Sequence, residues 1–211
     1  MAAFLSNLKF VAWTALAVGL LFLIYFTVGE AGYPPGDTVF WEAVLRWSHV
    51  LVGIMWIGHL YYFNFTQIPN APKIPEEHRG PAIGKVIAPA ALYWFRWGAM
   101  LTLITGLLLA WNQGYLIEAL TLGALDQPSF AVPKTIMIGI GMWLAIIMWF
   151  NVWFIIWPHQ QKALNINNAY PDLDGATKAA SAKTAMLFSR TNTFLSVPML
   201  VAMTGASTLF N

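Results

Sequence analysis

Residues 134–157 have the sequence KTIMIGIGMWLAIIMWFNVWFIIW, in which Lys134 is the single charged residue and stands first. A helix needs about 20 mostly apolar residues to cross the hydrocarbon core of a bilayer. This stretch meets that requirement in both length and composition. It therefore predicts a transmembrane helix.

Four further apolar segments lie elsewhere in the chain, and stretches rich in Pro, Gly and charged residues separate them. The five predicted spans are residues 8–29, 41–65, 91–112, 134–157 and 187–208. Within lipid each segment must satisfy its own backbone hydrogen bonds, and the alternating pattern of barrel strands is absent from the sequence. We therefore expect an all-α integral membrane protein in which residues 1–211 form one domain, a bundle of about five transmembrane helices.

The overall composition supports this class. The chain is 58% hydrophobic and only 9% charged, with a mean hydropathy of +0.61, whereas soluble domains carry about 25% charged residues. This excludes a water-soluble enzyme, a disordered tail and a nucleic-acid-binding domain, and it makes membrane lipid an expected partner. The net charge of +2 is too small to indicate a polyanionic partner. Because the chain has no Cys, it has no thiolate metal site, no iron–sulfur cluster and no covalent attachment site for c-type haem.

The cations predict the orientation. Nine of the 11 Lys and Arg residues fall on the side of the N-terminus, and they are Lys9, Lys73, Arg79, Lys85, Arg96, Lys162, Lys178, Lys183 and Arg190. Only Arg46 and Lys134 fall on the other side. The positive-inside rule then predicts a cytoplasmic N-terminus and an external C-terminus, in a multi-pass protein of a bacterial inner membrane. The apolar run after Lys9, about 19 residues, is longer than the ~7–15 of a signal peptide, so we expect a retained helix.

The connections are also predicted. Residues 66–90 contain five prolines, which favours a stiff extended excursion. Residues 158–185 include a turn at 167–172, and the Ala- and Lys-rich stretch after it predicts a short helix on the membrane surface. Residues 115–122 predict an interfacial turn of helix.

Histidines inside or near the spans are the main candidates for chemistry, because polar groups in hydrocarbon need a partner or a task. His49 could be an axial ligand of b-type haem, a structural residue bonded to Ser, Thr or Asn on another helix, or a proton relay. The relay is the weakest of these, because no Asp or Glu lies deep in a predicted span.

A second pair, His59 and His159, is predicted near the cytoplasmic membrane face, where the two could bind haem iron or a transition metal or could simply face water. Asn151 could support this pair through hydrogen bonds, or could bond a neighbouring helix. Arg46 could bind a haem propionate or an anionic substrate, or could extend to the interface. His49, His59, His159, Arg46 and Asn151 are therefore the candidate cofactor-binding residues, and the three histidines are the candidate metal ligands.

Four blocks in this order resemble the membrane domain of the bacterial urate hydroxylase family, the urate oxidase N-terminal domain. The first is Arg46-Trp47-Ser48-His49 with Trp56-Ile57-Gly58 and Tyr61-Tyr62-Phe63; the second is Ala88-Pro89-Ala90 with Trp94-Phe95-Arg96-Trp97 and Gly106. The third is Asn151-Val152-Trp153-Phe154-Ile155-Ile156-Trp157-Pro158 with Gln160; the last is Pro171-Asp172 with Gly175, Ser189, Asn192 and Leu195-Ser196-Val197-Pro198.

The resemblance covers most of residues 44–203 and does not include the family's cytochrome c domain. It implies a helical membrane domain in which His49 is the one matching histidine. The first block by itself is also similar to haem-handling membrane proteins of the protoporphyrinogen oxidase and copper-resistance types. Thr191 and Ile140 stand where the resemblance would place two further histidines, and His59 and His159 stand where it would place Ser and Asn.

These observations lead to one principal expectation and two alternatives. We expect a protein that binds haem b or a transition metal and acts in electron transfer, as a subunit of a larger membrane complex or beside a cytochrome c. The first alternative is a non-catalytic accessory subunit that keeps the fold without a cofactor. The second is urate or purine oxidation with electron delivery to a separate cytochrome c.

Overall fold

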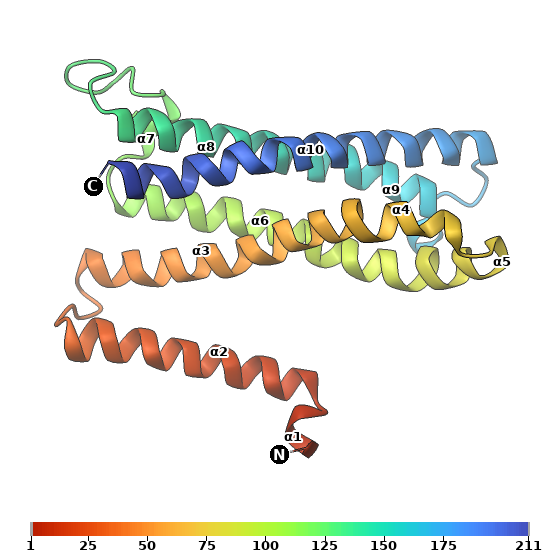
Figure 1. Ribbon diagram of the computed structural model, residues 1–211, viewed down its shortest axis with the longest axis horizontal. Helices are drawn as coiled ribbons and strands as arrows, with labels where there is room; N and C mark the ends of the chain where they lie inside the picture. Colours follow the sequence, from red (N-terminus) through yellow and green to blue (C-terminus); the bar gives the residue numbers. More distant parts are fainter. Residues whose placement is uncertain (1, 211) are drawn as a thin grey trace.

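The computed structural model describes residues 2–210, which form helices and turns and contain no strand (Figure 1). The long helices are α2 (Leu8–Ile24), α3 (Thr38–Tyr61), α6 (Ala88–Asn112), α8 (Pro133–Phe150) and α10 (Gly175–Leu209). The shorter α-helices are α1 (Ala2–Leu5), α4 (Ile68–Asn70), α5 (Glu76–Arg79), α7 (Leu116–Leu120) and α9 (Trp157–Leu164). The π-helical segments are η1 (Tyr25–Glu30), η2 (Tyr62–Gln67), η4 (Gly80–Ile87) and η5 (Asn151–Ile156), and the 3₁₀ turns are η3 (Ala71–Lys73) and η6 (Ile166–Asn168).

Four continuous helical stretches in residues 2–210 are long and apolar enough to cross a membrane. They are Leu8–Glu30, Thr38–Lys73, Glu76–Asn112 and Pro133–Leu164. This confirms the prediction of an all-α, multi-pass membrane protein. The fifth predicted span, 187–208, is the second half of α10, which is less apolar because its buried face carries Ser189, Asn192 and Ser196.

Asn and Asp side chains fix where three of the long helices begin. Asn7 accepts hydrogen bonds from the backbone N–H groups of Lys9 and Phe10, and Asp37 accepts one from Val39 at 2.8 Å. Asp174 accepts from the backbone and the hydroxyl of Thr177. An N-cap satisfies donors that the first helical turn leaves free. These caps therefore set the starts of α2, α3 and α10.

Two predicted connections are wrong. Residues 66–90 are mostly helical rather than extended: Pro69 and Pro72 lie near the end of the continuous stretch Thr38–Lys73, and Pro81 and Pro89 lie within Glu76–Asn112. The π-helical segments η2 and η4 directly precede Pro69 and Pro89, and such wider turns are typical of places where the helical hydrogen-bond ladder is interrupted. The Ala- and Lys-rich stretch after the turn near residue 170 is the beginning of α10, not a separate surface helix. The predicted interfacial turn within 115–122 is present as α7.

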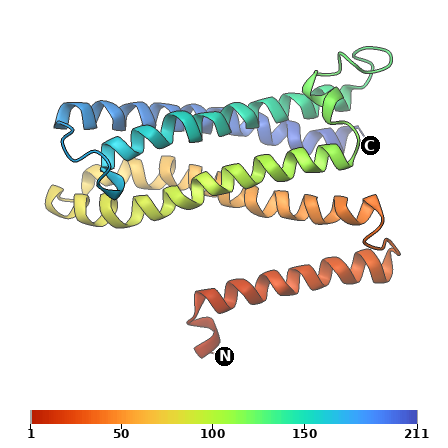
Figure 2. The same cartoon turned by 180° about the vertical axis from the view of Figure 1, so that it is seen from behind.

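The long helices run in alternating directions (Figures 1 and 2). The connections from α3 to α6 and from α9 to α10 lie at one end of the bundle, which we call the loop end. The α6–α8 connection and the C-terminus lie at the other, which we call the C-terminal end. This arrangement agrees with the sides to which the cations were assigned. Helix α2 lies beside α3, away from the other long helices, and contains no buried residue. It contacts α3 where a Cβ added to Gly19 would lie 3.4 Å from the Trp47 ring.

Small residues hold the other four helices in two close pairs. A Cβ added to Gly98 of α6 would lie 3.1 Å from the backbone N of Trp56 in α3, and one added to Gly141 of α8 would lie 3.1 Å from the Cβ of Ala202 in α10. Glycine at such positions lets helix backbones approach closely. The pairs α3/α6 and α8/α10 are therefore the tightly packed units of the bundle.

The two pairs meet mainly in the half near the loop end. Its core contains Trp56, Leu60, Phe95, Met148 and Val152, each at most 1% exposed. Large apolar side chains fill this half, while the half near the C-terminal end leaves space between the two pairs and has a smaller core of Ala110, Ala119 and Met142. The candidate site residues Arg46 and His49 lie in the half near the C-terminal end.

Candidate functional site

A cavity of about 1300 Å³ lies between the two helix pairs, in the half near the C-terminal end, and is open to the surface where the exposed residues Val50 and Ile54 line it. Its walls come from α3, α6, α8 and α10, and the loop residue Tyr115 adds to its outer part. Ligand pockets commonly measure about 300–1,000 Å³ and are mostly apolar with a few placed polar groups. This cavity is large enough for a cofactor-sized molecule.

His49 of α3 lines this cavity. Its Nδ1 lies 3.0 Å from the backbone oxygen of Thr102 and 3.2 Å from Oγ1 of Thr105, both on α6. The Thr102 carbonyl can only accept, and the Thr105 hydroxyl already donates to the oxygen of Leu101 at 2.6 Å. In a neutral imidazole Nδ1 must therefore carry the proton, which leaves the lone pair on Nε2.

Nε2 has no hydrogen-bond partner within residues 2–210. An imidazole whose Nδ1–H is bonded to a carbonyl and whose Nε2 is free is the usual arrangement of a metal-ligating histidine, because the second bond fixes the ring and its tautomer. The predicted structural role is also met, since His49 bonds Thr105 of another helix. One ring nitrogen thus anchors the ring, and the other is available to a ligand.

Gly106 of α6 makes room for the His49 ring. A Cβ at this position would lie 2.8 Å from Cε1 and 3.2 Å from Nδ1 of His49. Gly53 also lines the cavity from α3. These two glycines allow the imidazole, and any flat group beside it, to approach the helix backbones.

Trp56 lies deeper in the same cavity wall. Its indole N–H is buried and has no hydrogen-bond partner in the described chain, and the residue is only 1% exposed. A buried donor without a partner costs about 1–3 kcal/mol. This N–H is covered by protein atoms and does not face the open part of the cavity.

The cavity becomes polar toward the C-terminal end of the bundle. Arg46 and Glu42 of α3 form an ion pair at 2.5 Å there, and Lys134 of α8 lines the same region. Burial raises the pKa of the Tyr115 phenol; Arg46 partly opposes this rise and Glu42 adds to it. Tyr115 is therefore a neutral donor at this mouth.

The structure separates the predicted site residues into two groups. Arg46 and His49 line the large cavity, whereas His59, His159 and Asn151 do not. His59 directs Nδ1 to the backbone oxygen of Met55 in its own helix at 2.7 Å, and Nδ1 of His159 is buried without a partner in residues 2–210. No group of three or more His, Asp or Glu residues in that range is placed to hold a metal ion. The His59–His159 metal site stays a prediction.

Asn151 takes part in an interhelical hydrogen bond. Its Nδ2 donates to Oδ1 of Asn192 at 2.8 Å, and Nδ2 of Asn192 donates to the oxygen of Met148 at 2.9 Å. Asn64 also reaches α10, where its Nδ2 donates to the hydroxyl of Ser189. Asn151 and Asn64 lie in π-helical segments, whose wider turns are not evident from hydropathy. These contacts tie α10 to the neighbouring helices.

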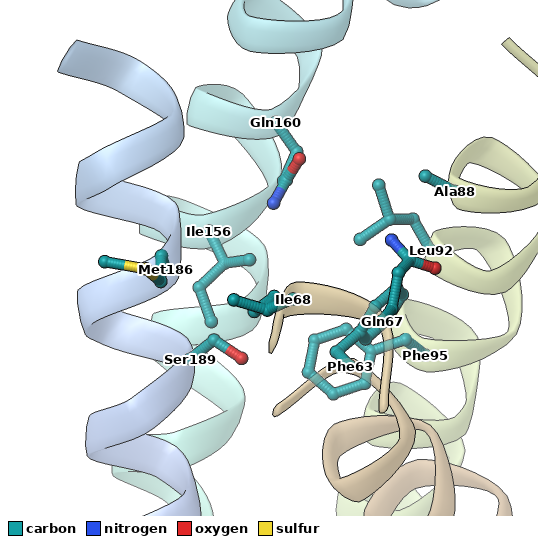
Figure 3. A pocket seen from close by; sticks show the side chains of 10 residues that line it. All are labelled: Phe63, Gln67, Ile68, Ala88, Leu92, Phe95, Ile156, Gln160, Met186 and Ser189. Atoms are coloured by element: carbon teal, nitrogen blue, oxygen red, sulfur yellow. The ribbon is translucent and has the colours of Figure 1, made fainter. Parts of the chain in front are cut away.

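A second cavity, of about 40 Å³, lies near the loop end (Figure 3). Its polar side chains are Gln67, Gln160 and Ser189, surrounded by apolar residues such as Phe63 and Leu92. A water molecule needs about 10–15 Å³ of such space. This cavity therefore has room for a few water molecules and is too small for a macrocycle.

Sequence reasoning missed three features of the large cavity: Lys134 at its mouth, Tyr115 beside it and the contact of Gly106 with His49. Lys134 is one of only two cations assigned to the side opposite the N-terminus, and this exception could have identified it as a candidate site residue.

Comparison of the chain with protein-family profiles, with curated proteins and with solved structures finds no match.

Proposed function

We propose that this chain is a multi-pass protein of the bacterial inner membrane that binds haem b in the large cavity and acts in electron transfer, as part of a larger membrane complex. The observation that supports this most is the free Nε2 of His49 on a cavity of about 1300 Å³, with Nδ1–H directed to Thr102. Haem iron accepts a neutral imidazole as an axial ligand.

The residues of the cavity fit such a group. His49 would bind the iron, Thr102 and Thr105 hold its ring, and Gly106 leaves space beside it. No second histidine lines the cavity, but Met142, Met199 and Met203 do, and a thioether is a known axial ligand. When bound, the group would supply one-electron chemistry. The chain's own part is to bind it, orient it and keep it in an apolar environment.

The test is the absorption spectrum of the purified full-length chain, made with haem supplied, before and after dithionite. We expect a Soret band that His49→Ala removes and the control His59→Ala retains, because His59 does not line the cavity. No Soret band and no bound iron in the unmodified protein would refute the proposal. A band that survives His49→Ala would exclude His49 as the ligand.

A second candidate function is that of a cofactor-free accessory subunit. The observation in its favour is α2, which has no buried residue and whose apolar side chains face outward. Such a surface is covered by lipid or by another membrane subunit. Stoichiometric co-purification with a partner complex, together with a cofactor inventory by optical spectroscopy and mass spectrometry, distinguishes this role: it predicts a partner and no haem.

A further inference from the structure

The mouth of the large cavity holds an unusual pair of charges. Of the 11 Lys and Arg residues, only Arg46 and Lys134 lie toward the C-terminal end, and both line this cavity. Cations are disfavoured on the translocated side of a membrane protein. The two that are nevertheless there line the same cavity.

The two cations come from different helix pairs. Arg46 is on α3 and its side chain is 49% exposed, while Lys134 is in the first turn of α8. Glu42 neutralises Arg46, but Lys134 forms no ion pair within residues 2–210. The N-terminal end of α8, which favours anions, lies at the same place. The charged residues that line the cavity, Glu42, Arg46 and Lys134, therefore carry one net positive charge, although Asp37, Glu118 and Asp126 also lie at this end of the bundle.

The interior has the opposite character. Past His49 the lining is dominated by apolar side chains such as Ile57, Met142, Met199 and Met203. A small soluble anion would leave this part of the cavity unused, and a purely apolar molecule would make no use of Arg46 and Lys134. The combination fits an amphiphile with an acidic end and a large apolar body.

We propose that Arg46 and Lys134 bind the carboxylates of a porphyrin at the mouth of this cavity, so that its apolar edge extends inward past His49. The inference rests on the proposed haem function and adds the orientation and the acid specificity of the ligand. Both cations can donate charge-assisted hydrogen bonds to carboxylate oxygens. Glu42 competes with the ligand for Arg46.

Metal-free protoporphyrin IX and its dimethyl ester test this, because neither needs an iron ligand. Each is titrated by fluorescence into the full-length chain in phosphatidylcholine nanodiscs. We expect the diacid to bind about fivefold to thirtyfold more tightly than the ester, as two partly exposed charge pairs would give. Arg46→Gln with Lys134→Gln should remove this preference and leave ester affinity unchanged. The control Lys162→Gln, at the loop end, should change neither, and Glu42→Gln should tighten the diacid.

Three results would overturn the inference. The first is equal affinity for the diacid and the ester in the unmodified protein, and the second is that Lys162→Gln loses the preference for the diacid as fully as the Arg46 and Lys134 variant does. The third is that adding phosphatidylglycerol to the nanodiscs abolishes the preference, which would identify a lipid headgroup as the anion. The proposed haem function fails separately. In that case iron protoporphyrin gives no His49-dependent Soret band, whether or not the metal-free diacid is preferred.

Discussion

Replacing Gly106 by Ala tests whether His49 is held as the structure places it. The added Cβ would lie 2.8 Å from Cε1 and 3.2 Å from Nδ1 of the imidazole. The ring cannot simply turn away, because Nδ1 is bonded to Thr102 at 3.0 Å and lies 3.2 Å from Thr105. Either this bonding breaks or α6 moves away from α3.

The magnitude follows from three contributions. Ala in a helix interior is favoured over Gly by about 0.5–1 kcal/mol. Overpacking costs about 1–3 kcal/mol, and loss of the Nδ1 hydrogen bond costs about 0.5–1.5 kcal/mol more. The net effect of Gly106→Ala is therefore a destabilisation of about 1–3 kcal/mol. Gly53→Ala is the matched control, since its nearest neighbour is Cγ2 of Thr102 at an ordinary 3.9 Å. It keeps the helix gain of up to about 1 kcal/mol.

The assay is thermal unfolding of the full-length chain in detergent, followed by Trp fluorescence, with haem titration by the Soret band on the same samples. About 1 kcal/mol shifts Tm by about 2–4 °C for a chain of this size. We expect Gly106→Ala to lower Tm by several degrees and to weaken haem binding. Gly53→Ala should have a Tm at or above that of the unmodified protein. If both variants give the same Tm and the same Soret titration, the His49 ring is not packed against α6 and the reasoning is refuted.

Three further predictions concern other parts of the bundle. Asn192→Leu should lower the free energy of unfolding by about 1–3 kcal/mol, because it leaves the Asn151 amide and the Met148 oxygen without partners. The double variant with Asn151→Leu should recover part of this loss, and chemical denaturation of both variants measures it. Hydrogen bonds from the side chain and then the backbone of Thr177 lower the pKa of Asp174, so its stabilisation is present above the unfolded value of 3.8 and is lost as pH falls through the lower folded value. Tm should therefore fall more steeply below about pH 4 in the unmodified protein than in Asp174→Asn, which keeps the cap without the charge. A reporter at the C-terminus should be active only outside the cytoplasm, and a labelling tag in the α9–α10 connection should be protected from external reagent; the opposite result for both would reverse the predicted orientation.

The membrane-spanning class could be predicted because it depends on a property summed over about 20 residues. Where the helices end could not, because that depends on single residues. Prolines such as Pro81 and Pro89 predict a break in the helix, yet both lie within the continuous helical stretch Glu76–Asn112, which includes the π-helical segment η4. Whether a proline ends a helix or is accommodated by a local change of helix type depends on the backbone around it, and hydropathy does not report this.

The cavity could be predicted only in part, for a related reason. The sequence shows that Gly53 and Gly58 permit close approach on α3, yet in the structure nothing lies within 4 Å of a Cβ added to Gly58, and only Cγ2 of Thr102 lies near one added to Gly53. The pairing of α3 with α6 places Gly98 against Trp56 and Gly106 against His49. A single sequence shows which residues are small, but not which residues of the neighbouring helix they face. His49 was therefore identifiable as a candidate, while the groups that fix its ring were identifiable only as isolated polar residues, Thr102 and Thr105.

The charge pattern connects orientation with the site. Arg46 and Lys134 weaken the bias by which the orientation was predicted, and the remaining nine cations still determine it. Replacing both residues by Gln would strengthen the bias, so the orientation should be unaffected while the cavity loses its cationic mouth. Topology therefore gives no reason for these two cations, and the ion pair with Glu42 accounts only for Arg46. Lys134 is exposed and lines the cavity without an ion pair in residues 2–210, so in the proposed complex it is the cation that is free to bind a carboxylate of the ligand.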